Sequence, residues 1–249
     1  MRRVVPDTAG GLPAALQPTA VCLQGLPAPD AVEFALPDGH VCLVVADRSD
    51  TSAALVERLR GSEWQTVKLV TGETGELEGF DVPLAGFDEE AVRAALAEVR
   101  ARHGPVGFCI YLHPQSSKAI EDAVLTASGR ARLTLPFLLA KHLQPGLVDA
   151  AGLGRAGFVT VTALDGMLGL SGAADADPVA GGVAGLTKTL RLEWPEVYCR
   201  AVDLDPQMGA DEGAAAIVAE LHDPNRLLAE VGYGEQGRVT LVAGEVALG

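Results

Sequence analysis

"HVCLVVADRSDTSAALVERLRG" (residues 40–61) is the stretch that decides the fold. Its first seven residues, 40–46, form an unbroken apolar and β-branched run, which predicts a strand buried on both faces. Ser49 or Asp50 then serves as the N-cap of an amphipathic helix, and Gly61 ends that helix. A buried strand that leads at once into a capped helix is half of a βαβ unit.

The same alternation continues along the chain. The patterns predict further strands at 65–70, 106–112, 157–164, 197–205 and 237–242, and helices at 88–104, 117–143, 178–194 and 212–221. We expect the helix at 117–143 to break at Gly129 or Pro136. The fold class is therefore α/β, with a doubly wound, mostly parallel sheet in which the strands at 40–46, 106–112 and 157–164 run in the same direction.

Two segments carry turn and loop signals instead of a helical or strand period. Residues 1–38 are rich in proline, so we expect an extended leader or linker with a short strand near 20–23, and a domain over residues 39–249. "TGETGELEG" (71–79) combines glycines with three glutamates and predicts a solvated loop.

Composition excludes several classes of function. The 249 residues include 19 Lys+Arg against 33 Asp+Glu, a net charge of −14 that would repel phosphate backbones and anionic lipid, so we expect neither a nucleic-acid nor a membrane partner. No apolar run reaches the roughly 18 residues that span a bilayer, which favours a cytoplasmic protein. The four cysteines lack CxxC spacing and the five histidines lack HxxxH or HExxH pairing, so we expect core thiols and no metal site.

The turn that follows the first strand argues against a bound dinucleotide. Such a site needs glycines there, so that backbone N–H groups can approach the pyrophosphate at the helix N-terminus. The turn "VVADRSDTSAAL" (44–55) has no glycine, and Asp47 and Asp50 place carboxylates where phosphates would lie. We therefore expect no cofactor, and a turn from Ala46 to Thr51 that its own side chains close.

"GGVAGLTKTLRLEW" (181–194) is similar to the active-site helix of short-chain reductases. In those enzymes a tyrosine four residues before the lysine donates a proton. Here Lys188 is present, but Ala184 stands at the tyrosine position, and Thr160 or Thr162 falls near the position of the catalytic serine. Thr162, Ala184 and Lys188 are thus degenerate positions, and we predict no catalytic residue.

The remaining candidates have structural interpretations. None of the tyrosines at 111, 198 and 233 has a lysine four residues later, and we expect Tyr111 and Tyr198 to pack inside strands. Lys188 is expected to be a helix-surface lysine, with contact to a partner domain or an anion as the alternative. The small residues around Ala184 suggest that this helix packs closely on the sheet.

The blocks "GFVTVTALDGMLGLSG" (157–172) and "DPVAGGVAGLTKTLRLEWPEVYCRAVDLDP" (177–206) resemble the ketoreductase region of type I polyketide synthases and polyunsaturated fatty acid synthases. The resemblance covers roughly residues 35–245 and is strongest to the N-terminal structural subdomain of that region. It implies a truncated, degenerate Rossmann-like fold of the short-chain dehydrogenase/reductase type. It also implies that NADPH and the catalytic Ser, Tyr and Lys belong to a second, partner subdomain.

The first hypothesis is therefore a non-catalytic structural subdomain that braces the catalytic half of a ketoreductase, with that half and other synthase domains as its partners. The catalytic half would reduce carrier-bound β-ketoacyl thioesters. One alternative is a free-standing, divergent NADPH-dependent short-chain reductase. A second alternative is an orphan scaffold or interaction module for another synthase domain.

Overall fold

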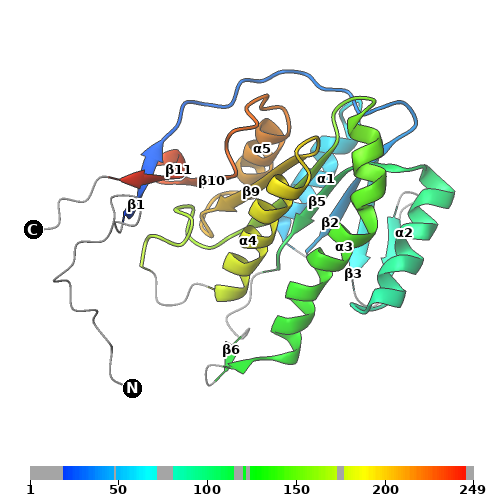
Figure 1. Ribbon diagram of the computed structural model, residues 1–249, viewed down its shortest axis with the longest axis horizontal. Helices are drawn as coiled ribbons and strands as arrows, with labels where there is room; N and C mark the ends of the chain where they lie inside the picture. Colours follow the sequence, from blue (N-terminus) through cyan, green and yellow to red (C-terminus); the bar gives the residue numbers. More distant parts are fainter. Residues whose placement is uncertain are drawn as a thin grey trace, which may run out of the picture.

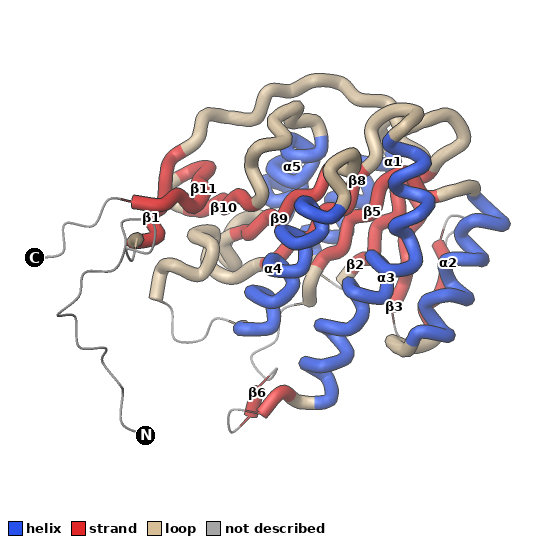
Figure 2. The backbone as a smooth tube through the Cα atoms, viewed as in Figure 1, coloured by secondary structure: helices blue, strands red, loops and turns tan. Residues whose placement is uncertain are grey.

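The computed structural model describes residues 19–47, 49–71, 81–114, 120–121, 124–172 and 177–244. Over these residues a nine-stranded sheet lies between two layers of helices (Figures 1 and 2). The strand order is β1-β11-β10-β9-β8-β5-β2-β3-β4. The strands are β1 (Ala20–Gly25), β2 (Val41–Ala46), β3 (Thr66–Thr71), β4 (Asp81–Leu84), β5 (Val106–Leu112), β8 (Gly157–Thr162), β9 (Tyr198–Leu204), β10 (Glu230–Gly234) and β11 (Gly237–Gly244). The short β6 (Ile120–Glu121) and β7 (Val124–Leu125) form a separate hairpin.

The centre of the sheet is parallel, as predicted. β2 pairs with β3 and β5, and β5 pairs with β8, all in parallel. Every residue of β2, β5 and β8 is buried, because helices cover both faces. Only β10–β11 and β11–β1 are antiparallel within this sheet.

Helices pack on both faces, which confirms the doubly wound arrangement (Figure 1). One face carries α2 (Glu89–His103), α3 (Ala127–Ala151) and α4 (Pro178–Glu193), and the other carries α1 (Asp50–Arg60) and α5 (Ala210–Leu221). Side chains of each strand alternate between the two cores. Leu43 and Val45 face α2–α4, whereas Cys42 and Val44 face α1 and α5.

The helix boundaries follow the capping residues. Ser49, the first of the two predicted alternatives, caps α1 by accepting from the backbone N–H of Ser52. Asp88 caps α2, and Asp177 caps α4 just before Pro178. Gly61 follows the end of α1, as expected.

The prediction for the helix at 117–143 was wrong at both ends and at its break. α3 begins after the cap Thr126 and continues without interruption through Pro136 and Pro145 to Ala151. Burial explains the tolerance of Pro136, because Leu135, Pro136 and Leu139 all lie in the core. Apolar packing along the helix offsets the backbone hydrogen bond that proline cannot donate.

Two strands of the main sheet were missed, β4 and β10, and the hairpin β6–β7 lies where a helix was predicted. β4 contains Pro83 and lies at the edge of the sheet, where a missing N–H is tolerated. β10 (EVGYG) contains two glycines, which weaken the strand signal. The loop predicted at 71–79 lies outside the described residues from position 72 onward.

The expected short strand near 20–23 is present as β1, but it is part of the main sheet. β1 pairs with β11 from Ala20↔Gly244 to Gly25↔Val239. The following segment also contacts the domain, since Trp64 Nε1 donates to the Phe34 carbonyl at 2.7 Å and Arg155 stacks 4.1 Å from the Phe34 ring centroid. The domain was expected to start at residue 39, with an extended leader before it. Instead, β1 and the segment that follows it pack on the domain and belong to it.

The prediction of core thiols is confirmed for the cysteines of β2, β5 and β9, but it is wrong for Cys22, which is exposed on the edge strand β1. Cys42, Cys109 and Cys199 are buried free thiols, and burial raises the pKa of Cys199 to about 12. Among the described residues, no helix is both long and apolar enough to cross a membrane.

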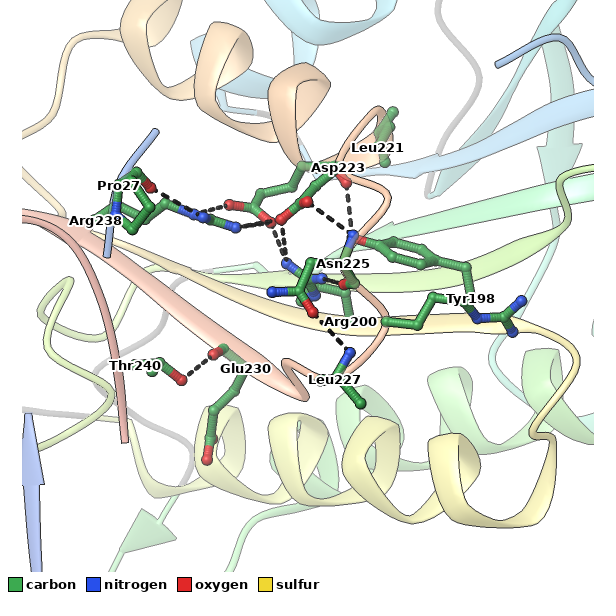
Figure 3. Close-up of polar contacts among 12 residues, drawn as sticks. Pro27, Tyr198, Arg200, Leu221, Asp223, Asn225, Leu227, Glu230, Arg238 and Thr240 are labelled. Carbon is green, nitrogen blue, oxygen red and sulfur yellow. Dashed lines mark hydrogen bonds and ion pairs between the residues drawn. The ribbon is translucent and has the colours of Figure 1, made fainter. Parts of the chain in front are cut away.

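A buried charge network joins β9, β11 and the end of α5 (Figure 3). Arg200 and Glu220 are fully buried and form an ion pair. Arg238 Nε donates to Glu220 Oε1 at 2.7 Å, and Arg238 Nη2 donates to Asp223 Oδ2 at 2.5 Å. Two arginines therefore balance two carboxylates, so the cluster carries no net charge.

Neutral groups complete the network. Tyr233 Oη donates to Glu220 Oε1 at 2.6 Å, and Arg238 Nη1 donates to the carbonyl of Pro27 at 3.0 Å. Burial and the Glu220 carboxylate raise the pKa of Tyr233. Burial would lower the pKa of Arg238, but its hydrogen bonds to Glu220 and Asp223 and the charge of Glu220 together outweigh burial and raise that pKa. The arginine is thus charged, the phenol is neutral, and the network fastens the segment after β1 to the sheet.

We expect Glu220→Ala to lower the free energy of unfolding by about 3–5 kcal/mol, because two buried guanidinium groups would lose their shared carboxylate. Urea unfolding followed by tryptophan fluorescence measures the change. Glu212→Ala removes an exposed carboxylate from the same helix and should change stability by less than about 0.5 kcal/mol. Equal effects of the two substitutions would contradict a structural role of the network.

Candidate functional site

A crevice of about 480 Å³ opens at the carboxyl ends of β2, β5, β8 and β9. It lies where the strand order reverses, because β2 leads through α1 to β3 on one side and has β5 on the other. Open α/β sheets bind their ligands at this position. Its polar lining consists of the carboxylates Asp47, Asp50 and Asp205, the hydroxyls of Ser49, Thr51 and Thr162, and the imidazole of His113. None of the described lining residues is a lysine or arginine.

The turn from β2 to α1 uses its own polar groups internally. Asp47 Oδ1 accepts from the Ser49 N–H at 3.0 Å and from the Ser49 hydroxyl at 2.5 Å. Ser49 Oγ in turn accepts from the Ser52 N–H at 3.2 Å, and the Ser52 hydroxyl donates to the Asp47 carbonyl at 2.9 Å. Arg48 lies outside the described residues. The described part of the turn does not fit a pyrophosphate group, since a helix N–H is already capped and carboxylates line the approach.

Thr162 reaches the crevice at the end of β8. Its hydroxyl donates to Asp203 Oδ1 at 3.0 Å, so it is bound to a buried carboxylate. Thr160 lies two residues earlier in β8, and its hydroxyl shares a 2.7 Å hydrogen bond with the hydroxyl of Thr187 of α4. Both threonines therefore have partners within the fold.

Lys188 does not face the crevice with Thr162. Its Nζ donates to Glu230 Oε2 at 2.8 Å. Glu230 is in register with Ala201 of β9, and Ala201 with Thr160 of β8, two residues before Thr162 along the strand. The lysine thus joins α4 to β10, away from the carboxyl edge of the sheet.

Ala184 is half-buried on α4. The expectation that the small residues around it pack closely on the sheet was wrong. At Gly182 an added Cβ would lie 3.1 Å from Leu133 of the helix α3, and at Gly181 and Gly185 it would meet nothing within 4 Å. These two positions face open space because α4 contacts the sheet through other residues, such as Val183 and Thr187.

The tyrosines at 111 and 198 are packing residues, as predicted. Both are buried, and burial raises the pKa of each. Tyr111 Oη donates to the Arg132 carbonyl at 3.1 Å and Tyr198 Oη donates to the Glu220 carbonyl at 2.7 Å.

Sequence reasoning missed a loop that two aspartates fold over the carboxyl edge beside the crevice. Buried Asp203 accepts from the backbone N–H of Leu164 at 2.7 Å and of Leu168 at 3.0 Å, and burial raises its pKa to about 6. Asp165 accepts from the N–H groups of Met167, Gly169 and Ser171 at 2.8–2.9 Å. The signal was available in "ALDGMLGLSG", because aspartate and glycine at this spacing are typical of ordered turns.

A buried histidine that lines the crevice was also missed. His113 follows β5, and its Nε2 lies 3.6 Å from Asp177 Oδ2, which also accepts from Arg132 Nη1 at 3.3 Å. Burial lowers the pKa of His113, which keeps the ring neutral at neutral pH. The cluster ties β5, α3 and the cap of α4 together.

Comparison with known proteins relates the sequence to one segment of a fatty acid synthase. No model of a known protein family matches the sequence. One of the subunits of the polyunsaturated fatty acid synthase of Thraustochytrium sp. (strain ATCC 26185 / S-3) is 30% identical over 226 residues, or 86% of this chain. The chain is a homologue of one segment of this synthase protein. It spans 8% of the length of that relative.

Solved structures agree on the fold. The adenylation, ketoreductase and pseudo-Asub multidomain structure of a keto acid-selecting NRPS module has a TM-score of 0.68 over 92% of this chain and 18% of that chain, at 14% identity. An oxidoreductase of the short-chain dehydrogenase/reductase family from Brucella ovis has a TM-score of 0.56 over 77% of this chain and 98% of that chain, at 17% identity. This chain therefore has a Rossmann-like fold of the short-chain dehydrogenase/reductase type.

Fold alone does not decide what this segment does. A ribose-5-phosphate isomerase from Brucella melitensis, at 18% identity, has a TM-score of 0.59 over 77% of this chain and 88% of that chain. Related architectures thus occur in proteins with different activities, and the chemistry of the crevice must carry the functional argument.

Gly166 lets the loop lie against β10, since an added Cβ would be 2.3 Å from the Tyr233 carbonyl oxygen. We expect Gly166→Ala to cost about 1–3 kcal/mol more than Gly169→Ala, because the added methyl group overpacks the contact. Gly169 is a matched control, with positive φ (+82°, against +66° at Gly166) but open space around its Cβ position. Urea unfolding of both variants measures the difference, and equal costs would contradict the contact.

The loop should also respond to acid through Asp165. Burial alone would raise the pKa of this carboxyl, but hydrogen bonds from Ser171, Gly169 and Met167 outweigh burial and lower the pKa to about 2. The ordinary value is about 3.9, so the carboxylate stabilises the folded state fully above about pH 4 and loses this effect as the pH falls through 2. Discounted for solvent screening, the contribution is about 1–2 kcal/mol.

NMR titration of the aspartate side-chain carbons tests this expectation, and hydrogen exchange at Gly169 follows the loop. Asp165→Asn should remove the change in the protection factor of the Gly169 amide between pH 2 and 4, where the protection factor is the exchange rate of an unfolded peptide divided by that of the folded protein. An Asp165 carboxyl that titrates at its ordinary value would contradict the prediction.

Proposed function

We propose that this chain is the structural, non-catalytic subdomain of a ketoreductase in a polyketide or polyunsaturated fatty acid synthase. Its partner is the NADPH-dependent catalytic half, which reduces carrier-bound β-ketoacyl thioesters, and the chain contacts other domains of the synthase. The homology to a synthase segment and the reductase-like fold support this assignment.

The position of Lys188 is the observation that carries the proposal. In a short-chain reductase the lysine works beside a tyrosine and the cofactor, whereas here it is bound to Glu230 at 2.8 Å, away from the crevice. Ala184 offers no phenol one turn earlier, and the Thr162 hydroxyl is bound to Asp203. Proton transfer to a ketone needs a donor within hydrogen-bond reach, and these three positions supply none.

The acidic crevice supports the same conclusion for the cofactor. Asp47, Asp50 and Asp205 surround the place that a dinucleotide would occupy, and Ser49 already caps α1. We propose that NADPH binds to the catalytic half alone.

A brace acts through rigidity. Catalytic groups must be held within about 0.5 Å of their productive positions, which requires support from residues that do not touch the substrate. The fully buried central strands and the neutral charge network give this domain a stiff sheet that can supply such support.

The experiment compares wild type, Ala184→Tyr and each of them mixed with the catalytic half, with NADPH oxidation and a β-ketoacyl thioester mimic as the assay. We expect no turnover by either protein alone. The added phenol would supply only an acid, worth about 10²–10⁴-fold for a bound substrate, and calorimetry should detect no NADPH binding. Both mixtures should turn over equally, and faster than the catalytic half alone.

The outcomes separate the rival functions. Turnover by the isolated variant, or NADPH binding by the wild type, would identify a divergent free-standing reductase. Mixtures no faster than the catalytic half alone would favour a scaffold for a different synthase domain. Urea unfolding of Ala184→Tyr serves as the control, because a variant that does not fold cannot support either conclusion.

A further inference from the structure

Two leucines stand out on the surface at the amino edge of the sheet, opposite the crevice. Leu227, in the loop between α5 and β10, is 85% exposed, and Leu192, at the end of α4, is 76% exposed. Arg191 joins the two elements, since its Nη2 donates to the carbonyls of Arg226 and Leu227 at 3.0 Å. We call Arg191, Leu192, Pro195, Arg226 and Leu227 the Leu192–Leu227 patch.

A hollow of about 290 Å³ lies within this patch. Arg191, Leu192, Pro195 and Arg226 line its sides, and Val197, Tyr198 and Cys199 at the start of β9 line its floor. The hollow is large enough for an apolar side chain, and both guanidinium groups lie beside it.

The hollow is positively charged in a chain whose net charge is −14. Arg191 donates to the carbonyls of residues 226 and 227, and Arg226 donates to the carbonyl of Pro195 at 2.8 Å. Within the described residues, no carboxylate forms an ion pair with either arginine. The exposed Glu193 and Glu196 are near in sequence, but they do not line the hollow.

Hydrogen bonds between Asn225 and its neighbours hold the loop that presents Leu227 (Figure 3). Asn225 Oδ1 accepts from the Leu227 N–H at 2.9 Å, and the Asn225 carbonyl accepts from buried Arg200. The Asn225 N–H donates to Asp223 Oδ1 at 2.9 Å. An exposed leucine on an anchored loop loses little conformational freedom on binding, which favours affinity.

We infer that the Leu192–Leu227 patch docks an acidic amphipathic helix of another protein domain, whose leucine enters the hollow and whose glutamates face Arg191 and Arg226. An apolar anchor in a pocket with charges at its rim is the usual composition of a binding hot spot. The inference rests on the patch alone and does not depend on the proposed function.

Two synthetic helical peptides with the same leucines test it, one with glutamates and one with lysines around the central leucine. Fluorescence anisotropy measures their binding to the full chain. We expect the acidic peptide to bind at least about tenfold more tightly than the basic one, and more weakly as salt screens the charges. Equal binding of the two peptides, or no binding of the acidic one at millimolar concentration, would overturn the inference.

Substitutions locate the site. Leu227→Ser and Leu192→Ser should each lower the affinity for the acidic peptide by about tenfold. Leu153 is a 73% exposed leucine outside the patch, and Leu153→Ser should leave this affinity unchanged. Arg191→Glu with Arg226→Glu should reverse the preference toward the basic peptide. Because Arg191 also holds the loop, circular dichroism and urea unfolding check that the double glutamate variant is folded. The serine variants test the site with both arginines in place.

A small-anion site is the competing outcome. If inorganic phosphate displaces the acidic peptide and the leucine substitutions have no effect, then the arginines bind anions without a docking helix, and the inference fails.

Discussion

The buried pairing of Arg200 with Glu220 is the interaction on which the rest of this half of the molecule depends. Two arginines and two carboxylates cancel inside the protein, and removal of any one would leave a buried charge. Through Arg238 the network holds the carbonyl of Pro27, and thus the segment that follows β1. Through Asn225 it holds the loop that carries Leu227. One cluster therefore fixes both the extra antiparallel strand and a surface feature.

At the opposite end of the sheet, where the strands have their carboxyl ends, aspartates organise the loops in a different way. Asp203 and Asp165 do not pair with arginines but accept backbone N–H groups, and they fold residues 163–171 into an ordered loop. Asp47 satisfies the first turn in the same manner. At the end of the sheet where related folds bind ligands, backbone N–H groups thus occupy oxygens of all three carboxylates.

The two ends of the sheet differ in their surface chemistry. The crevice at the carboxyl ends of the strands is lined by aspartates, hydroxyls and His113, whereas the amino side presents apolar and cationic groups on a fixed loop. We propose that the fixed sheet and the exposed patch serve contacts with other domains of a synthase, because a relative of this chain is one segment of such a protein.

The sequence alone determined the parallel core, the cap Asp177, and the absence of a tyrosine four residues before Lys188, and it narrowed the cap of α1 to Ser49 or Asp50. These features depend on residues close together in the chain, such as an apolar run or a missing tyrosine four residues before a lysine. Only the tertiary structure decided where Lys188 points, because its partner Glu230 is 42 residues away. The same holds for β1 in the sheet, for the continuity of α3 through Pro136, and for the network around Glu220. Each results from contacts between distant segments, and local sequence patterns carry no record of which distant segment will lie alongside.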